Sequence, residues 1–409
     1  MKYPGLIGGV GGFLLGAVTS LVVVACAPNV EAAVSPPIVT AAPDIEPLPA
    51  AVASETTLPQ LTAELDSLAG QGQFNGAVLV ARGDQIIFRQ AYGVADVETG
   101  QRLAADDRFR LASVSKQFTA AAILRLQDEG LLSITDPVCR WISPCPEGWA
   151  AIRLSHLLSH TSGLPDLMDR PGWGDRRVAP ATLDDLTRET EQYQPRFEPG
   201  SRADYNNAGY NLLAEVVSRA SGQPFERYLQ RTFFDPLGMD DTGSDADDRG
   251  HGVVRGHNAG GAGLVPGPVA NVSIIAGAGA LYSTLDDMLT WQRALHHGRI
   301  LSEAGYAQMI ADHGPADQGL PEGARPRAWG FGVFTSDLAS GAIPAFSAPQ
   351  IYHTGSWAGF RNMVSYLPSQ DVTVIVLTNN YHQRDRVFLI TQQAMAEAIG
   401  APFPTGLSQ

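Results

Sequence analysis

The stretch Leu-Ala-Ser-Val-Ser-Lys at residues 111–116 ends in one of only two lysines in the chain. Lys and Arg together number 28, so the other 26 are arginines. The second lysine, Lys2, lies in a segment that we expect to be removed from the mature protein. Arginine stays protonated in proteins, whereas a buried lysine can lose its proton and act as a base. The single retained lysine, Lys116, therefore indicates a position that needs a removable proton.

Ser113 precedes this lysine by three positions. Residues i and i+3 share a face of a helix, so the Lys116 amine can reach the Ser113 hydroxyl. The alanine-rich residues 117–132, with Gly130 as a stop, predict a helix that has Ser113 at its N-terminal end. Free N–H groups and the dipole at a helix start favour negative charge, which suits a serine nucleophile with a lysine partner. The alternative is a serine N-cap beside a solvated lysine, and this motif alone does not separate the two.

The rest of the chain predicts strands near both ends and helices between them. Strands are expected at residues 75–81, 85–91, 329–335, 351–354, 360–367 and 372–378. Helices are expected at Leu61 to Leu68, at 210–220, at 225–229, after Ser283 and Thr284, and at 386–399, with a Gly/Pro-rich loop around 260–268. The pattern predicts an α+β fold, an α/β sandwich: one antiparallel sheet formed from both ends of the chain, flanked by helices, with an inserted, mostly helical region.

Composition excludes some functions. The chain has 409 residues, of which 44% are hydrophobic, enough for a large core. The net charge of −14 and the lack of a basic run argue against nucleic acid, and they give no support for binding an anionic membrane surface. The acidic run at 235–248 predicts a solvated turn; a calcium loop is the alternative, although the EF-hand spacing is missing.

Residues 1–26 predict a targeting segment. Lys2 is followed by an apolar run at residues 6–24, and Val-Val-Ala-Cys at 23–26 resembles a bacterial lipobox, in which Cys26 is lipidated and becomes the N-terminus. An uncleaved transmembrane anchor is the alternative, since the run is nearly long enough to span a bilayer. Either places the rest of the chain outside the cytoplasm, and the lipoprotein places it in the bacterial cell envelope, facing the periplasm.

Residues 27–57 are rich in Ala and Pro, which predicts a semi-extended tether that reaches up to ~90 Å. A folded domain is expected at 58–400, followed by a tail at 401–409. Without Cys26 the chain keeps an even pair, Cys139 and Cys145, and we expect these to form a disulfide in an oxidising periplasm.

Three further motifs follow the lysine: Phe-Glu-Pro-Gly at 197–200, Tyr-Asn-Asn-Ala-Gly-Tyr at 205–210 and His-Thr-Gly-Ser at 353–356. Together with S-x-x-K they resemble the motifs of the serine β-lactamase and penicillin-binding protein family. The resemblance is closest to the branch of class C β-lactamases, D-Ala-D-Ala carboxypeptidases and esterases, whose middle motif is Y-x-N. Residues 75–80, 157–164 and 280–284 add to a likeness that covers about residue 60 to 400.

The resemblance implies a role for each residue. Ser113 attacks an acyl carbon and forms an acyl-enzyme. Lys116 and Tyr205 share the task of taking its proton, and the neighbouring cation is expected to lower the pKa of Tyr205. Asn207 orients the carbonyl of the substrate. No deacylation base is identified.

The resemblance implies that the third motif, at residues 353–356, contributes to the far wall of the site. The backbone N–H groups of Ser113 and Ser356 would form the oxyanion hole. Thr354 and His353 would line the far wall, and Gly355 would let the substrate lie close to the strand. His353 stands where the family usually has lysine, so a permanent charge facing a substrate carboxylate is not assured.

These motifs predict a serine hydrolase that forms an acyl-enzyme on an amide or ester. The activity that they favour is that of a D-Ala-D-Ala carboxypeptidase or a β-lactamase-like enzyme. An esterase or D-amino-acid amidase of the same fold, and a non-catalytic envelope lipoprotein, are the alternatives. No cofactor or metal is expected, because His156 and His160 lack the glutamate of a zinc motif and no P-loop is present. The expected partners are a small-molecule or peptide substrate and, through the lipid anchor, a membrane; the oligomeric state stays open.

Overall fold

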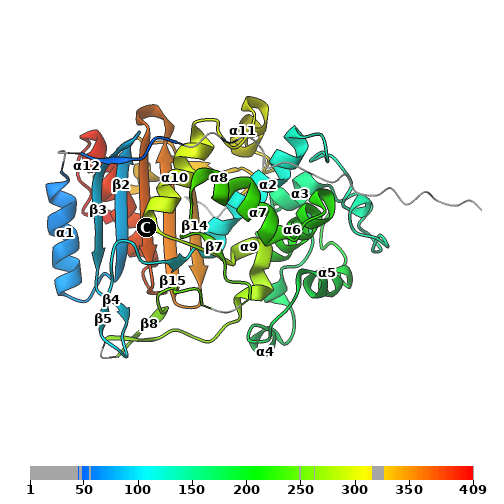
Figure 1. Ribbon diagram of the computed structural model, residues 1–409, viewed down its shortest axis with the longest axis horizontal. Coiled ribbons are helices and arrows are strands. Elements are labelled where there is room, and N and C mark those ends of the chain that lie inside the picture. The colour runs from blue at the N-terminus through cyan, green and yellow to red at the C-terminus, as the bar shows by residue number, and fades with distance from the viewer. Residues whose placement is uncertain are drawn as a thin grey trace, which may run out of the picture. The chain divides into compact units, whose positions relative to one another are not determined.

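The computed structural model describes residue 45 and the ranges 48–54, 57–247, 250–261, 263–315 and 327–408. Its main element is an eight-stranded sheet. In spatial order the strands are β1 (Val52–Ala53), β3 (Gln85–Tyr92), β2 (Gly76–Arg82), β16 (Val372–Thr378), β15 (Phe360–Leu367), β14 (Gln350–Trp357), β12 (Phe334–Ser336) and β11 (Ala328–Trp329). All neighbours are antiparallel except β1 and β3. Figure 1 shows the blue strands β2 and β3 on one side of the sheet and the orange β14 and β15 on the other, so both ends of the chain build it, as predicted.

The pairing of β2 with β16 joins the two ends of the chain. It runs in register from Val372 opposite Arg82 to Thr378 opposite Gly76. Side chains alternate between the two faces of a strand, and here both faces are buried. Ile375 belongs to the core on one face of the sheet and Val376 to the core on the other. A strand buried on both sides needs a continuous apolar run, which residues 374–377 supply.

Helices α1 (Pro59–Gly70) and α12 (Arg384–Ile399) cover one face of the sheet. The Glu397 carboxylate accepts hydrogen bonds from the backbone N–H groups of Gln60 (2.9 Å) and Leu61 (2.7 Å). It thereby satisfies two of the N–H groups that a helix leaves free in its first turn. The last helix of the chain thus caps the first.

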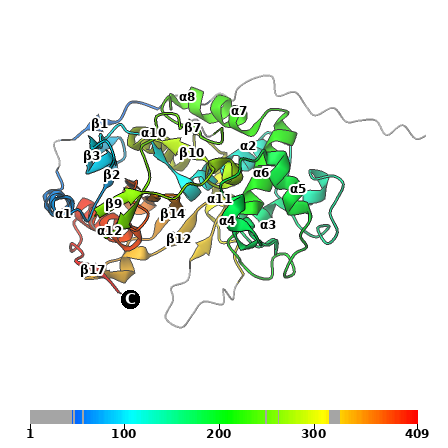
Figure 2. The ribbon, with the colours of Figure 1, turned by 90° about the horizontal axis from the view of Figure 1, so that it is seen from below.

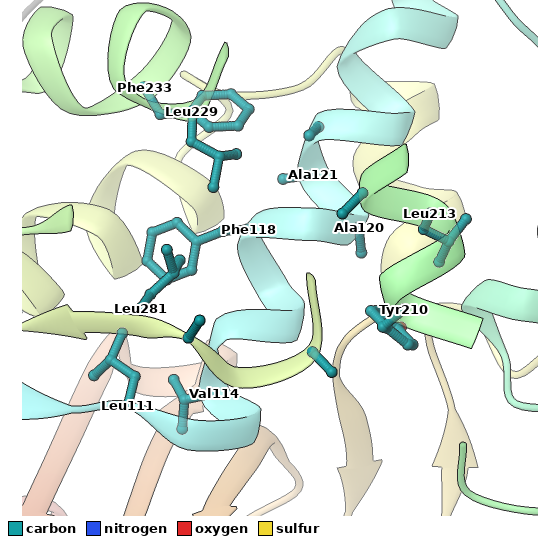
Figure 3. Packing of buried hydrophobic residues seen from close by; sticks show 14 of the residues in the cluster. Leu111, Val114, Phe118, Ala120, Ala121, Tyr210, Leu213, Leu229, Phe233 and Leu281 are labelled. Atoms are coloured by element: carbon teal, nitrogen blue, oxygen red, sulfur yellow. The ribbon is translucent and has the colours of Figure 1, made fainter. Parts of the chain in front are cut away.

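The core on the other face includes residues of α2 (Lys116–Asp128), α6 (Asn207–Ser221) and α10 (Leu285–His296), and α10 lies against β2 and β16. Figure 2 shows α10 and α12 on opposite sides of the sheet. Helix α10 starts where its sequence predicts, because the Thr284 hydroxyl accepts a hydrogen bond from the N–H of Asp287 (3.2 Å). The Phe118 ring of α2 stacks on Trp291 of α10 with centroids 4.0 Å apart. Figure 3 shows Phe118 among Leu281, Leu229 and other apolar side chains, so α2 is fixed deep in the core.

The remaining elements form the inserted helical region and small sheets at its border. They are β4 (Val94–Asp96), β5 (Gln101–Arg102), β6 (Phe109–Arg110), α3 (Leu154–Leu158), α4 (Trp173–Arg176), α5 (Leu183–Glu191), α7 (Phe225–Leu229), α8 (Asp235–Leu237), β7 (Gly243–Ser244), β8 (His257–Gly260), β9 (Gly263–Pro266), α9 (Ala276–Gly279), β10 (Leu281–Ser283), α11 (Glu303–Ile310), β13 (Ala342–Ile343) and β17 (Gly406–Leu407).

A disulfide joins Cys139 and Cys145, whose Cα atoms are 4.9 Å apart. Among the helices that the structure describes, none has the length and apolar content needed to cross a membrane. The apolar run at residues 6–24, Cys26 and most of the predicted tether lie outside the described residues.

Three details of the predicted fold are wrong. Residues 329–335 are not one strand: β11 and β12 are separated by a turn in which Gly332 has φ +68°, and a Cβ there would lie 2.4 Å from the Lys116 carbonyl oxygen. The expected loop around 260–268 contains a hairpin, because Gly260 and Gly263 pair at its tip and extend the pairing of β8 with β9.

The third error concerns the acidic run at 235–248. The sequence predicts a solvated turn, but the run contains α8 and β7, and Asp245 is fully buried. The Arg110 guanidinium lies 2.6 Å from the Asp245 carboxylate and compensates its charge.

Candidate active site

Ser113 lies in a 3-10 turn (Ala112–Ser115) immediately before α2. Helix α2 begins at Lys116, one residue before the predicted helix at 117–132, so Ser113 lies at its N-terminal end as expected. Ala112 has φ +51°, a left-handed conformation that is costly for any residue with a side chain. The turn still brings the amine of Lys116 to 3.2 Å from the hydroxyl of Ser113.

Gly355 allows this turn to approach β14. A Cβ at Gly355 would lie 2.1 Å from the Leu111 carbonyl oxygen, far inside contact distance. Gly355 therefore makes room for the segment that carries Ser113, a role beyond the expected approach of substrate to the strand.

Lys116 is fully buried. Its amine donates to the Asn207 side-chain oxygen (2.8 Å) and to the Ala278 carbonyl (2.9 Å), as well as to Ser113. Burial lowers the pKa of Lys116 to about 7, although the Asp166 carboxylate opposes this shift. The alternative of a solvated lysine is thus wrong, and near neutral pH a large share of the amine is free to accept a proton.

Tyr205 borders the same amine, which lies 4.8 Å from the centroid of its ring. Burial raises the pKa of the phenol well above its usual value, and the hydrogen bond with Ser113 only partly opposes this. The expected lowering is wrong, because the loss of hydration outweighs both the hydrogen bond with Ser113 and the positive charge of Arg327. Tyr205 therefore stays protonated and is suited to pass a proton on, while Lys116 is the better base.

Asp166 is part of the site and was not identified from sequence. Its carboxylate accepts hydrogen bonds from the backbone N–H (3.0 Å) and the side-chain Nδ2 (2.8 Å) of Asn207. These bonds turn Oδ1 of Asn207 toward Lys116. The side-chain Nδ2 of Asn207 also makes a long, weak contact with Sδ of Met168 (3.9 Å). Asp166 is also the N-cap of a short turn, because its side chain accepts a hydrogen bond from the N–H of Leu167. Aspartate is common at that position, so the sequence did not mark Asp166 as a residue of the site.

His156 and His160 serve local structure. The Nδ1 of His156 accepts from the backbone N–H of Arg153 (3.2 Å), and that of His160 accepts from the N–H of Asn206 (3.0 Å). The His160 ring stacks on Tyr205 with centroids 4.3 Å apart. His160 thus orients the Tyr205 ring, a role that the spacing of the two histidines does not suggest.

His353 of β14 is 2% exposed. Its Nδ1 lies 2.6 Å from the Thr354 carbonyl oxygen, and its ring stacks on Phe334. Burial lowers the pKa of His353 to about 3, and the positive charges of Lys116 and Arg327 act in the same direction. His353 is therefore neutral at physiological pH and supplies no charge for a substrate carboxylate.

A cavity of about 360 Å³ brings most of the predicted residues together. The predicted residues that line it are Ser113, Tyr205, Asn207, His353, Thr354 and Ser356. Arg327, which the sequence analysis missed among 26 arginines, lines it too. Its guanidinium carbon lies 4.3 Å from the ring centroids of both Trp329 and Phe334, so these rings hold a positive charge at the cavity.

One group of potential metal ligands occurs in the described part of the chain, outside this cavity. The ligand atoms of Asp245, Asp247 and His251 lie within 4.8 Å of one another. Asp245 pairs with Arg110, and His251 lies 2.7 Å from Asp247, so each of the three groups already has a partner within the protein.

The fold and this arrangement of serine, lysine and tyrosine define a serine hydrolase. The chain belongs to the Beta-lactamase family, whose family model matches residues 59–397. It works through an acyl-enzyme on an amide or an ester.

Two curated relatives and one solved structure show the range of the family. Penicillin-binding protein 4* of Bacillus subtilis (strain 168) is 27% identical over 83% of this chain and 75% of its own length. Esterase EstB of Burkholderia gladioli is 30% identical over 79% of this chain and 91% of its own. The D-amino acid amidase of Ochrobactrum anthropi SV3 has the same fold, with a TM-score of 0.72 at 21% identity over 84% of this chain and 99% of that one.

Proposed function

We propose that Ser113 is the nucleophile, that Lys116 is its general base, and that the preferred substrates are peptides of the D-Ala-D-Ala type. The observation that carries this proposal is the buried Lys116 amine, 3.2 Å from the Ser113 hydroxyl and with a pKa of about 7. A lysine of that pKa is half deprotonated at neutral pH, where a general base is most effective.

The reaction begins when the Ser113 oxygen attacks the substrate carbonyl carbon and its proton moves to Lys116. Negative charge builds up on the carbonyl oxygen, and the proposed oxyanion hole, the backbone N–H groups of Ser113 and Ser356, stabilises it. As the bond to the leaving group breaks, the leaving atom takes a proton through Tyr205, which Lys116 re-supplies. Water then hydrolyses the acyl-enzyme.

Arg327 supports a substrate that carries a carboxylate. His353 is neutral, so among the residues lining the cavity Arg327 supplies the fixed positive charge. A peptide ending in D-Ala-D-Ala has a carboxylate one residue beyond the bond to be cleaved. Esterase activity on neutral substrates is the second candidate, in view of the likeness to EstB.

Acylation by a penicillin, measured by mass spectrometry of the intact protein, tests the assignment. The wild type is expected to gain the mass of one penicillin, and Ser113→Ala to gain none. Ser369→Ala, which removes an exposed hydroxyl, is the matched control. Turnover of D-Ala-D-Ala peptides, nitrocefin and p-nitrophenyl esters then ranks the substrates; a wild type that none of these reagents modifies, and that cleaves none of them, would leave only the non-catalytic alternative.

The proposed location is the periplasmic side of the bacterial envelope, with the domain at 58–400 tethered through a lipid on Cys26. The disulfide between Cys139 and Cys145 supports an oxidising compartment. Cys26→Ser is expected to release the protein from the membrane fraction. Unchanged membrane association of that variant would instead favour a spanning anchor.

A further inference from the structure

Two residues that line the cavity, His353 and Trp357, each have a buried nitrogen without a protein partner among the described residues: Nε2 of His353 and Nε1 of Trp357. His353 is 2% exposed and Trp357 is 7% exposed. Buried polar groups are nearly always hydrogen-bonded, because losing water without a replacement is costly. Other such atoms occur away from the cavity, Nε1 of Trp141 for example, but at His353 and Trp357 a substrate in the cavity can supply the missing partners.

The chemistry of each nitrogen is fixed by its surroundings. The Thr354 carbonyl oxygen, 2.6 Å from Nδ1 of His353, can only accept, so Nδ1 carries the hydrogen of the neutral ring. Nε2 of His353 is then an acceptor, the opposite of the lysine that usually begins this motif. Nε1 of Trp357 carries a hydrogen and is a donor only. The wall thus offers one acceptor and one donor.

We propose that His353 accepts a hydrogen bond from the N–H of the bond to be cleaved, while Trp357 donates to a carbonyl oxygen of the same substrate, which makes this site selective for amides over esters. An amide presents both an N–H and a carbonyl oxygen, whereas an ester presents only acceptors. This inference rests on the proposed role of Ser113 and narrows its substrates to peptides and other amides.

The hydrogen bond to His353 also bears on the chemical step. When the carbon–nitrogen bond breaks, its electron pair stays on nitrogen, which must take up the proton that left Ser113. The ring of Tyr205 has its centroid 6.4 Å from that of His353, so both border the same part of the cavity. With its N–H held by His353, the nitrogen turns its lone pair toward the Tyr205 hydroxyl and leaves as an amine, while Ser113 keeps the acyl group.

The test compares one acyl group on two leaving groups, a D-alanine amide and the matching D-lactate ester. His353→Leu removes the acceptor, and His353→Gln places a side-chain oxygen near the position of Nε2. His353→Leu is expected to lower kcat/KM for the amide about tenfold more than for the ester, mostly through kcat, because one buried hydrogen bond is lost. His353→Gln should recover part of that loss. His382→Gln, on an exposed loop, is the control.

Equal losses on amide and ester in His353→Leu would overturn the inference and leave the role of Ser113 intact. Failure of the wild type to be acylated by either substrate would instead overturn the proposed function. Nitrogen-15 NMR gives a second measurement that needs no variant activity, with His353→Gln used only to assign the resonance. It should show hydrogen on Nδ1 and none on Nε2 at pH 7; hydrogen on Nε2 would overturn the inference.

Discussion

The amine of Lys116 and the side-chain oxygen of Asn207 lie 2.8 Å apart, although 91 residues separate them in the chain. The side-chain nitrogen of the same Asn207 amide donates a hydrogen bond to the Asp166 carboxylate. Lys116 is therefore positioned by a hydrogen-bonded relay and not by a direct ion pair. Burial lowers its pKa, and the Asp166 carboxylate at the end of the relay only partly opposes this.

Replacing Lys116 with arginine should abolish acylation of Ser113. Arginine keeps the charge but cannot release its proton at any pH that the protein survives. The expected loss is about 10²–10⁴-fold in the acylation rate, the usual contribution of a general base. Stopped-flow acylation by a chromogenic β-lactam measures it, and turnover near the wild-type rate would contradict the assignment of the base.

The pH dependence of kcat/KM should show a rise through about pH 7, as Lys116 loses its proton. Stability should depend on the same group. Between pH 7 and 10.5 the unfolded chain binds a proton on Lys116 that the folded chain does not, so this lysine makes the free energy of unfolding increase with pH across that window. Denaturant titrations at several pH values should show that this increase is smaller in Lys116→Met.

Asp166→Asn should move the activity profile to lower pH. The Asp166 carboxylate raises the pKa of Lys116 against the effect of burial, so its removal lowers that pKa further. Loss of the bond to Asn207 should also lower kcat, by about tenfold. Asp169→Asn, at an exposed ion pair with Arg196, is the matched control. An unchanged midpoint in Asp166→Asn would exclude this coupling.

Gly355→Ala should impair both folding and activity. Its methyl group would overlap the Leu111 carbonyl, so either β14 or the turn that carries Ser113 has to shift. We expect a fall in Tm of several degrees together with a loss of acylation. Gly406→Ala is the control, because no atom lies within 4 Å of a Cβ placed there. Wild-type acylation by Gly355→Ala would contradict this role.

Features that depend on neighbouring residues could be predicted from the sequence, whereas features that depend on tertiary contacts could not. The strand at 372–378 and the helix at 225–229 match their predicted bounds, since an apolar run or a helical spacing is written into neighbouring residues. The pairing of Ser113 with Lys116 was predicted for the same reason. The direction of the pKa shift of Tyr205 and the role of Gly355 were not, because burial and contacts with distant segments decide them.

Asp166 and Arg327 show why some residues of the site could not be predicted from the sequence. Each is one of many residues of its type, and neither stands at a spacing that marks it out. Their importance comes from where the fold places them, beside Asn207 and between two aromatic rings. Only spatial proximity identifies such residues.

The pairing of β2 with β16 has a consequence for biosynthesis. Strand β2 finds its neighbour only after residue 378 has been made, when more than nine-tenths of the chain already exists. Until then its second edge is open, and contacts this remote in sequence form slowly. Truncation near the carboxyl end should therefore leave an aggregation-prone remnant instead of a smaller working enzyme.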